Sequence, residues 1–355
     1  MKRNRSGTRK FTHFSFFLFV FSITFAFLLS EIILRIFGIG YGNAPLEASK
    51  IYHHVNPSDY QYIVHDPRGE YGGHTVIFDE FRYRVPKKTE RLTTHEYRRI
   101  YFFGDSFTVA IQESWSNSFV GKVGLNNQVY VRNMGVSSYS PIHYLVQVKK
   151  ELSKLSNADV VVQLFENDFD NDNLFRGIAN STDPNKIESI DGGPSSKMIK
   201  ILRYSYLARL IRKVQLQIYF LIDSSSSSSS SSSLTSDYKT EQEINNQHSF
   251  DKRIFSYEIL KEIKKITDMQ GARLHLMIIP SRTLSQNNNC CLKDWLHEEV
   301  KDFANVNKIS FIDLAKDFQE ASNQKALFFK SDIHLTAVGN DLVARSIKNH
   351  LSLQK

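Results

Sequence analysis

Cysteine is scarce in this sequence of 355 residues. The two cysteines present, Cys290 and Cys291, are adjacent and lie in a polar, asparagine-rich stretch. Two neighbouring cysteines cannot supply a framework of disulfide bonds or the ligands of a zinc site. Either a vicinal disulfide or two incidental thiols fits the pattern. The chain is long enough for one sizeable α/β domain with additional segments.

Two other features are missing: internal repeats and a metal-binding motif. The histidines at positions 53, 54, 65 and 74 have no thiolate near them, and their spacing fits no closed metal site. The sequence therefore predicts neither a metal nor a cofactor.

The charge is unbalanced. There are 45 basic and 37 acidic residues, a formal net charge of +8, which could indicate a nucleic-acid partner. However, five of the basic residues lie within the first ten positions, beside an apolar stretch that explains them better. The remaining basic clusters lack the pattern of a nucleic-acid reader, so we expect no nucleic-acid partner.

One long apolar run follows the basic N-terminus. Residues 11–30 carry no formal charge apart from His13, and twenty helical residues at a rise of 1.5 Å span a hydrocarbon core of about 30 Å. A signal peptide is the alternative, but the apolar character continues past Glu31 to Phe37, with no good cleavage site. We expect an uncleaved single-pass anchor over 11–37 in the inner (cytoplasmic) membrane. The basic tail, 1–10, is then cytoplasmic and the chain after Ile39 is periplasmic or otherwise extracytoplasmic.

Beyond the anchor, residues 38–98 are irregular, with short strand-like pieces at 74–78 and 81–85. From residue 99 onward, apolar runs alternate with helical stretches. The expected strands are 100–103, 129–131, 159–165, 272–279 and 309–314, and the expected helices are 117–127, 141–156, 251–270, 292–307 and 337–351. This alternation predicts a parallel sheet covered by helices on both faces.

Residues 169–250 interrupt the alternation and are interpreted as an insertion in the domain 99–355. Residues 197–222 predict a basic amphipathic helix, which could pack on the domain or lie on an anionic bilayer surface. The ten serines that follow, 224–233, cannot bury apolar area, and the pattern predicts a disordered loop.

Polar residues follow the predicted strands in a regular order. The first strand ends in Gly104-Asp105-Ser106. The second is followed by Gly135 and the third by Asn167. Before the last helix, which Thr336 is expected to cap, stand Asp332 and His334. Functional groups collect at the carboxyl edge of an open parallel sheet, so these residues are expected to meet. A serine hydroxyl needs a base to become a nucleophile, and a carboxylate can orient an imidazole in that role.

These motifs resemble those of the SGNH/GDSL hydrolase family, and more closely those of the membrane-anchored bacterial members of that family. The resemblance rests on "GDSFT" at 104–108, "NMGVSSY" around Gly135, "FEND" ending at Asp168 and "DIHLTAVG" at 332–339, and it spans about residues 99–352. It implies a flavodoxin-like three-layer α/β/α fold. It further implies that Ser106 is the nucleophile, His334 the base and Asp332 its partner, with an oxyanion hole from the Ser106 N–H, the Gly135 N–H and the Asn167 side chain.

Two departures from the family pattern stand out. The aspartate precedes the histidine by two residues instead of three, as in some acetyltransferase-like members. The third block has Phe165 or Glu166 where the family has glycine. Because alternate residues of a strand face opposite ways, we expect Glu166 to point away from Asn167.

The sequence thus predicts an outward-facing serine esterase or O-acyltransferase that forms an acyl-serine intermediate. The expected substrate is an acylated carbohydrate or lipid ester, in particular an acylated envelope glycan. A transferase would also need a separate membrane protein to deliver the acyl group, because the chain has no donor channel of its own. The alternative is a catalytically silent, membrane-tethered binding or assembly protein, against which the complete set of five site residues argues.

Overall fold

The computed structural model describes residues 6–37, 46–65, 69–87, 98–125, 129–192, 205–211, 214, 238–280, 295–321, 326–330 and 332–353. They belong to two units, Met1–Asn43 with Ser196–Ser233, and Ala44–Ser195 with Leu234–Lys355. The cysteine pair 290–291 and the serine tract 224–233 lie outside the described residues, as does most of the predicted amphipathic helix.

The first unit contains the long helix α1 (Ser6–Ile36). In the described part of the chain, one stretch is long and apolar enough to cross a membrane, namely His13–Ile36 with a mean hydropathy of 2.4. Its large apolar side chains are mostly exposed. Near its end, the Glu31 carboxylate accepts hydrogen bonds from the Ser205 hydroxyl and the Tyr206 N–H, at the start of a helical turn over 206–211.

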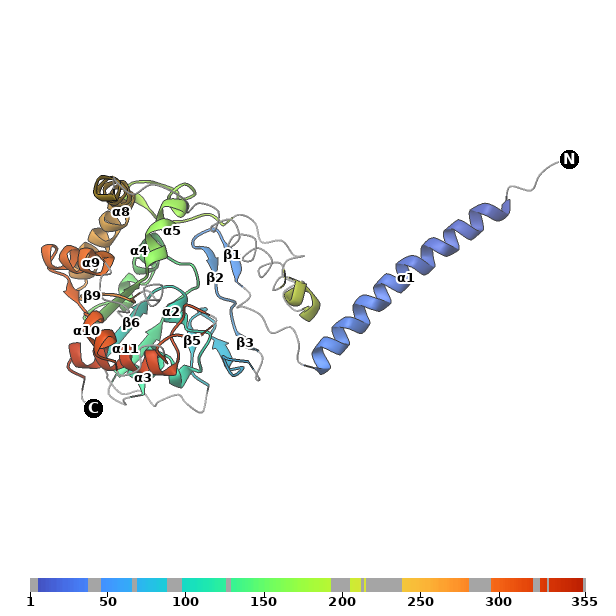
Figure 1. The fold of residues 1–355 in the computed structure, drawn as a ribbon, viewed down its shortest axis with the longest axis horizontal. Helices are drawn as coiled ribbons and strands as arrows, with labels where there is room; N and C mark the ends of the chain where they lie inside the picture. The colour runs from blue at the N-terminus through green and yellow to red at the C-terminus, as the bar shows by residue number, and fades with distance from the viewer. Residues whose placement is uncertain are drawn as a thin grey trace. The chain divides into compact units, whose positions relative to one another are not determined.

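The second unit is built on a sheet whose central strands are parallel (Figure 1). Five parallel strands lie in the order β10-β9-β8-β6-β7. They are β6 (Arg98–Phe103), β7 (Val129–Asn133), β8 (Asp159–Leu164), β9 (Arg273–Ile278) and β10 (Ser310–Phe311). These are the predicted strands, although the last is shorter than expected.

Successive side chains of these strands point to opposite faces of the sheet, so a separate hydrophobic core lies on each face. On β6, Tyr101 and Phe103 face one core, and Ile100 and Phe102 face the other. The first core lies under α4 (Pro141–Lys150), α5 (Glu166–Arg176), α8 (Tyr238–Met269) and α9 (Trp295–Val306). The second lies under α3 (Phe119–Gly124), α10 (Ala315–Glu320) and α11 (Ala337–His350). The predicted three-layer arrangement is confirmed.

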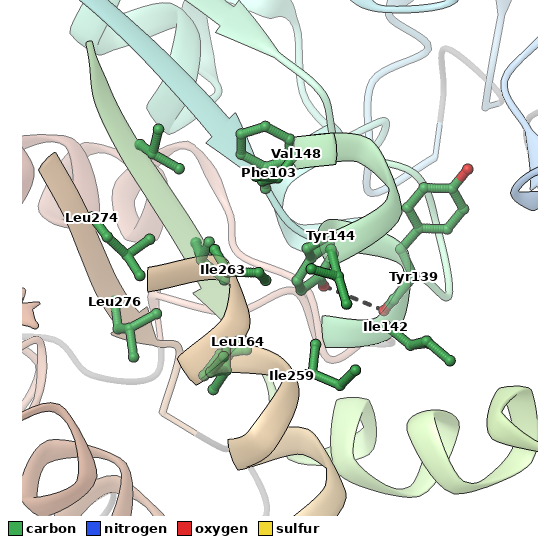
Figure 2. Close-up of a cluster of buried hydrophobic side chains, with 14 of the residues drawn as sticks. Phe103, Tyr139, Ile142, Tyr144, Val148, Leu164, Ile259, Ile263, Leu274 and Leu276 are labelled. Atoms are coloured by element: carbon green, nitrogen blue, oxygen red, sulfur yellow. Dashed lines mark hydrogen bonds between the residues drawn. The ribbon is translucent and has the colours of Figure 1, made fainter. Parts of the chain in front are cut away.

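Figure 2 shows the first core, where side chains of α4 and α8 meet those of the sheet. Ile259 and Ile263 of α8 lie close to Leu164 of β8 and Leu276 of β9, and all four are fully buried. Burial on both faces explains why these strands consist of nearly continuous apolar residues.

The N-terminal region of this unit is more regular than its sequence suggests. Strands β3 (Tyr60–Ile63), β4 (Thr75–Phe78) and β5 (Arg84–Val85) are antiparallel and extend the main sheet beyond β7. A separate hairpin is formed by β1 (Glu47–Ser49) and β2 (His53–Val55). The two strand-like pieces predicted near 74–78 and 81–85 correspond to β4 and β5.

The block 169–250 is only partly an insertion. Phe169, Phe175, Ile187 and Ile190 are buried in the first core, and α8 already begins at Tyr238. The part that leaves this unit is residues 196–233. The acidic, asparagine-rich composition of 166–173 hid the amphipathic character of α5, because its apolar side chains are few.

Candidate active site

The site lies where the strand order of the parallel sheet reverses. Strand β6 is flanked by β7 on one side and β8 on the other, and the crevice at such a switch point is the usual place for a ligand in open α/β sheets. Ser106 follows β6, Gly135 follows β7 and Asn167 follows β8, so three predicted site residues stand at the ends of adjacent strands.

Ser106 is the first residue of the short helix α2 (Ser106–Val109). Asp105 caps this helix by accepting a hydrogen bond from the Phe107 N–H at 2.9 Å. Gly104 is required because Thr108 folds back over it: a Cβ at 104 would lie 2.1 Å from the Thr108 Oγ1. The Gly-Asp-Ser sequence thus forms a tight turn that presents the serine at the start of a helix.

The three residues predicted as a triad are in contact. The Ser106 Oγ lies 2.7 Å from the His334 Nε2, and the His334 Nδ1 lies 2.7 Å from the Asp332 Oδ1. Because a carboxylate only accepts, the Nδ1 carries the proton and donates it, which leaves the Nε2 free to accept from the serine hydroxyl. The two-residue gap between Asp332 and His334 is therefore compatible with a direct hydrogen bond.

The Asp332 carboxylate has further donors from distant parts of the chain. Its Oδ2 accepts from the Tyr71 hydroxyl at 3.3 Å, and the Gln112 Nε2 lies 3.4 Å from the same oxygen. Burial opposes ionisation, but the hydrogen bond and the charge of His334 lower the pKa of Asp332 to about 2. Asp332 is therefore ionised at neutral pH.

Arg84 contacts the end of helix α2, the helix that begins at Ser106. This side chain is almost fully buried, and it donates to the carbonyl oxygens of Val109, Ala110 and Glu113, each at 2.5 Å. Carbonyl oxygens at the end of a helix lack partners within the helix, so the guanidinium satisfies those of Val109 and Ala110 and also binds the following turn at Glu113.

Gly135, predicted to supply an oxyanion donor, has its N–H in a hydrogen bond to the last residue of β7. Its N–H donates to the Asn133 Oδ1 at 3.0 Å, and the group is buried. A Cβ at 135 would lie 2.4 Å from the Val109 backbone nitrogen. The glycine is thus needed for close packing of the loop after β7 against α2.

Three residues later, Ser138 has an N–H that could donate to an oxyanion and that was not predicted from the sequence. It is exposed, its φ is +65°, and no acceptor for its N–H lies among the described residues. A serine in the left-handed region gives no signal in the sequence, because glycine or asparagine is the usual residue there.

Asn167 lies in the first turn of α5 and is half-buried, and within the described residues no hydrogen bond ties up its side-chain amide. The expectation that Glu166 and Asn167 alternate on a strand is wrong. Strand β8 ends at Leu164, and both residues belong to the helix, where Glu166 is exposed. The next residue, Asp168, caps the helix by accepting from the Phe165 N–H at 3.3 Å.

Three carboxyl groups are buried near the site. Burial raises the pKa of Asp105 and that of Asp172 to about 6. Burial and the neighbouring carboxylates Asp105 and Asp172 hold the pKa of Asp168 well above its usual range. Tyr144 donates to the Asp168 Oδ2 at 3.1 Å.

The four N-terminal histidines do not converge. In the described part of the chain, no group of three or more histidine, cysteine, aspartate or glutamate residues could hold a metal ion. His65 lies against the Tyr71 ring, and the His74 Nε2 is 3.8 Å from the Glu113 carboxylate. His53 and His54 pack near Phe175.

Comparisons with known proteins agree with this fold. Residues 238–355 match the model of the SGNH hydrolase-like domain of acetyltransferase AlgX. The predicted resemblance to the SGNH/GDSL hydrolases is confirmed, and the chain has an SGNH-like α/β fold. The matched segment contains Asp332 and His334, and Ser106 precedes it.

Solved structures that match this chain include a G-D-S-L family lipolytic protein from Veillonella parvula, with 12% identity, a TM-score of 0.40, and coverage of 72% of this chain and 100% of that one. An acetylxylan esterase from Geobacillus stearothermophilus has 12% identity and a TM-score of 0.40, covering 72% of this chain and 95% of its own. A GDSL-like lipase from Bacteroides thetaiotaomicron has 14% identity and a TM-score of 0.37, covering 75% and 90%. No curated protein compared with the chain matches it.

Proposed function

We propose that the protein is a membrane-anchored serine esterase or O-acyltransferase. The observation that carries this proposal is the continuous hydrogen-bonded chain from Ser106 through His334 to Asp332, with both joining distances at 2.7 Å. An acid, an imidazole and a hydroxyl in this order form the arrangement that activates serine for acyl transfer on several unrelated folds.

In the proposed mechanism, the Ser106 hydroxyl attacks an ester carbonyl while the His334 Nε2 takes its proton. Asp332 holds the imidazole in the required tautomer and stabilises its charged form. His334 then protonates the leaving alcohol, and an acyl-serine remains. Water or the hydroxyl of an acceptor attacks this ester and restores the free serine.

The charge on the tetrahedral intermediate needs preorganised donors. The proposed donors are the Ser106 N–H at the start of α2, the side-chain amide of Asn167 and the N–H of Ser138. Gly135, the third donor expected from the family, already donates to Asn133. We therefore propose the Ser138 N–H as the third oxyanion donor instead of the Gly135 N–H.

The proposed substrate is an acylated carbohydrate of the cell envelope. The description of the matched family model as an acetyltransferase domain supports acyl transfer between hydroxyl groups. If transfer is the reaction, a separate membrane protein delivers the acyl group. The N-terminal helix α1 is proposed to hold the catalytic unit on the outer side of the inner membrane, with its basic end inside.

The test uses the full-length chain in detergent micelles, with a fluorophosphonate probe and p-nitrophenyl acetate. We expect labelling and nitrophenol release, and a loss of about 10⁴-fold or more in Ser106→Ala. Ser114→Ala, a nearby half-buried serine outside the triad, should retain both. A folded wild-type protein that shows neither labelling nor a burst would favour the silent binding or assembly protein instead. Candidate glycans added to an active preparation then distinguish a hydrolase from a transferase.

A further inference from the structure

A histidine of the N-terminal hairpin contacts the loop that carries Ser138. The His54 Nε2 on β2 lies 2.8 Å from the carbonyl oxygen of Ser137, 83 residues away in the chain. On the other side of the ring, the His54 Nδ1 lies 2.8 Å from the His53 Nδ1. Both nitrogens of His54 therefore have defined partners.

These contacts determine which nitrogens carry protons. A carbonyl oxygen only accepts, so the His54 Nε2 must be the donor to Ser137. A neutral His54 then has a lone pair on Nδ1, which accepts from the Nδ1–H of His53. Burial lowers the pKa of His54 to about 4, so the neutral ring is the form present near neutral pH.

The ring of His54 is held by an aromatic cluster. Its centroid is 5.1 Å from that of Tyr139 and 5.7 Å from that of His143. The Tyr139 hydroxyl donates to the backbone carbonyl oxygen of His54 at 2.6 Å, so the imidazole itself is held by the packing of the neighbouring rings and not by this hydrogen bond. Tyr139 stands just before α4, beside the first core (Figure 2). The imidazole can therefore keep one orientation at little further cost in side-chain entropy.

The Ser137 carbonyl and the Ser138 N–H belong to the same peptide group. In a trans peptide, the C=O and the N–H point in opposite directions, and the described chain has no cis bond. Because His54 holds the carbonyl toward the cluster, the N–H of Ser138 points away from it. The exposure of Ser138 agrees with this direction.

The same loop is attached to the nucleophile turn. The Val136 N–H donates to the Gly104 carbonyl at 3.2 Å, and the Tyr139 N–H donates to the Val136 carbonyl at 3.1 Å. Asn56, from the segment after β2, donates to the Gly135 carbonyl at 3.1 Å. The loop after β7 is thus held on one side by the turn before Ser106 and on the other by residues of the N-terminal region.

We propose that His54 is a positioning residue: it holds the Ser137–Ser138 peptide so that the Ser138 N–H faces the charge that develops on the substrate. This inference rests on the proposed function, because an oxyanion donor has a role only in acyl transfer. It assigns a role to the adjacent histidines of β2, which belong to no metal-binding group among the described residues.

Three variants of the full-length chain test the proposal. His54→Leu replaces the imidazole with an apolar side chain of similar size and so removes the donor to the Ser137 carbonyl. His54→Gln keeps an N–H that can reach the Ser137 carbonyl. Tyr139→Phe is the matched control, because it removes a hydrogen bond to the His54 backbone and leaves the contact with Ser137 intact. Each is assayed for the rate of fluorophosphonate labelling, for kcat and KM with p-nitrophenyl acetate, and for thermal stability.

We expect His54→Leu to lower kcat and the labelling rate about 10-fold or more, with KM nearly unchanged, since a displaced donor acts in the transition state. His54→Gln should recover most of that loss, and Tyr139→Phe should stay within about twofold of the wild type. Equal losses in the leucine and glutamine variants, or a loss in His54→Leu no larger than in the control, would overturn the inference. If the wild type itself is not labelled, the proposed function fails, and the inference fails with it.

Discussion

The parallel and antiparallel sides of the main sheet contribute different residues to the site. The parallel side, β6 to β10, carries the residues proposed to react: Ser106 after β6, Asn167 after β8, and His334 before α11. The antiparallel side and its hairpin carry none of these, but they supply the side chains that hold them, among them Arg84 and Tyr71. Reactive groups and their supports thus come from regions with different architectures, and each region can be tested by itself.

Among residues outside the Ser106–His334–Asp332 chain, the largest effect is expected on the parallel side, from Asn167→Ala. We expect turnover to fall by about 10²–10³-fold, the usual cost of one oxyanion donor. The melting temperature should change little, because the Asn167 amide has no partner among the described residues. Steady-state kinetics and thermal unfolding measure the two quantities. Asn173→Ala on the same helix, which loses a hydrogen bond to the Phe169 carbonyl, should leave turnover intact. Parallel losses of turnover and stability in Asn167→Ala would contradict this role.

On the antiparallel side, Arg84→Lys should mainly reduce stability. Lysine cannot reach three carbonyl oxygens in the fork geometry of a guanidinium, so buried acceptors lose their donors. We expect a loss of about 2–3 kcal/mol in the free energy of unfolding, measured by urea denaturation. Arg82→Lys, two residues away and one-third exposed, is the matched control and should cost less than about 1 kcal/mol. An equal cost in both variants would show that Arg84 does not support α2.

Buried carboxyl groups of the parallel side predict how stability depends on pH. The pKa values of Asp105 and Asp172 are raised to about 6 in the folded chain, so the folded state binds more protons than the unfolded state between about pH 4 and pH 6. These two carboxyl groups therefore contribute stability that grows as pH falls from about 7 to about 5, whereas the buried His54 and His143, whose pKa values are lowered by burial, lose stability over the same range. The carboxyl contribution is measured as the difference between the wild type and a variant that lacks one of the two groups. Asp332, with its pKa lowered to about 2, loses its stabilising contribution only below this window.

Thermal unfolding at the two pH values checks this. Asp172→Asn, which keeps the acceptor for the Ile142 N–H, should lose this contribution, so the melting temperature of the wild type relative to the variant should rise between pH 7 and pH 5. A difference that stays constant or falls over this range would contradict the prediction.

The smallest effect is expected from Tyr71→Phe, which removes one donor to Asp332 across the boundary between the two sides. Gln112 and His334 still contact the carboxylate, so kcat should fall only about two- to fivefold. Tyr83→Phe loses a hydrogen bond to Glu151 instead and should leave kcat unchanged. If Tyr71→Phe behaves like Tyr83→Phe, the antiparallel side contributes nothing to the triad.

The same comparison explains what the sequence could predict. The parallel strands are buried on both faces, so continuous apolar runs mark them, and the polar residues that follow them meet at one edge. That logic predicted Ser106, Asp332 and His334, which the structure brings into contact, and Asn167, whose role stays a prediction. It did not locate β3 to β5 as parts of the same sheet, because short antiparallel strands pair by long-range contacts that leave little local pattern.

The side chains that hold the site were harder to recognise in the sequence, for a related reason. Arg84 lies between Tyr83 and Val85 in a stretch with several basic residues, and nothing local distinguishes the buried guanidinium from the partly exposed one of Arg82. Gly135 was predicted as a donor because glycine leaves the backbone accessible, but the same property allows close packing against α2. The sequence cannot separate these two uses of glycine.

The pairing of β5 with β7, through Arg84 and Asn133, also bears on solubility. Without the N-terminal strands, β7 would be the open border of the sheet, with unpaired N–H and C=O groups available to another molecule. A fragment beginning at Arg98 would contain every triad residue and every parallel strand, yet it would tend to self-associate along β7. We therefore expect the short strands before it to cover this border and to limit self-association of the sheet.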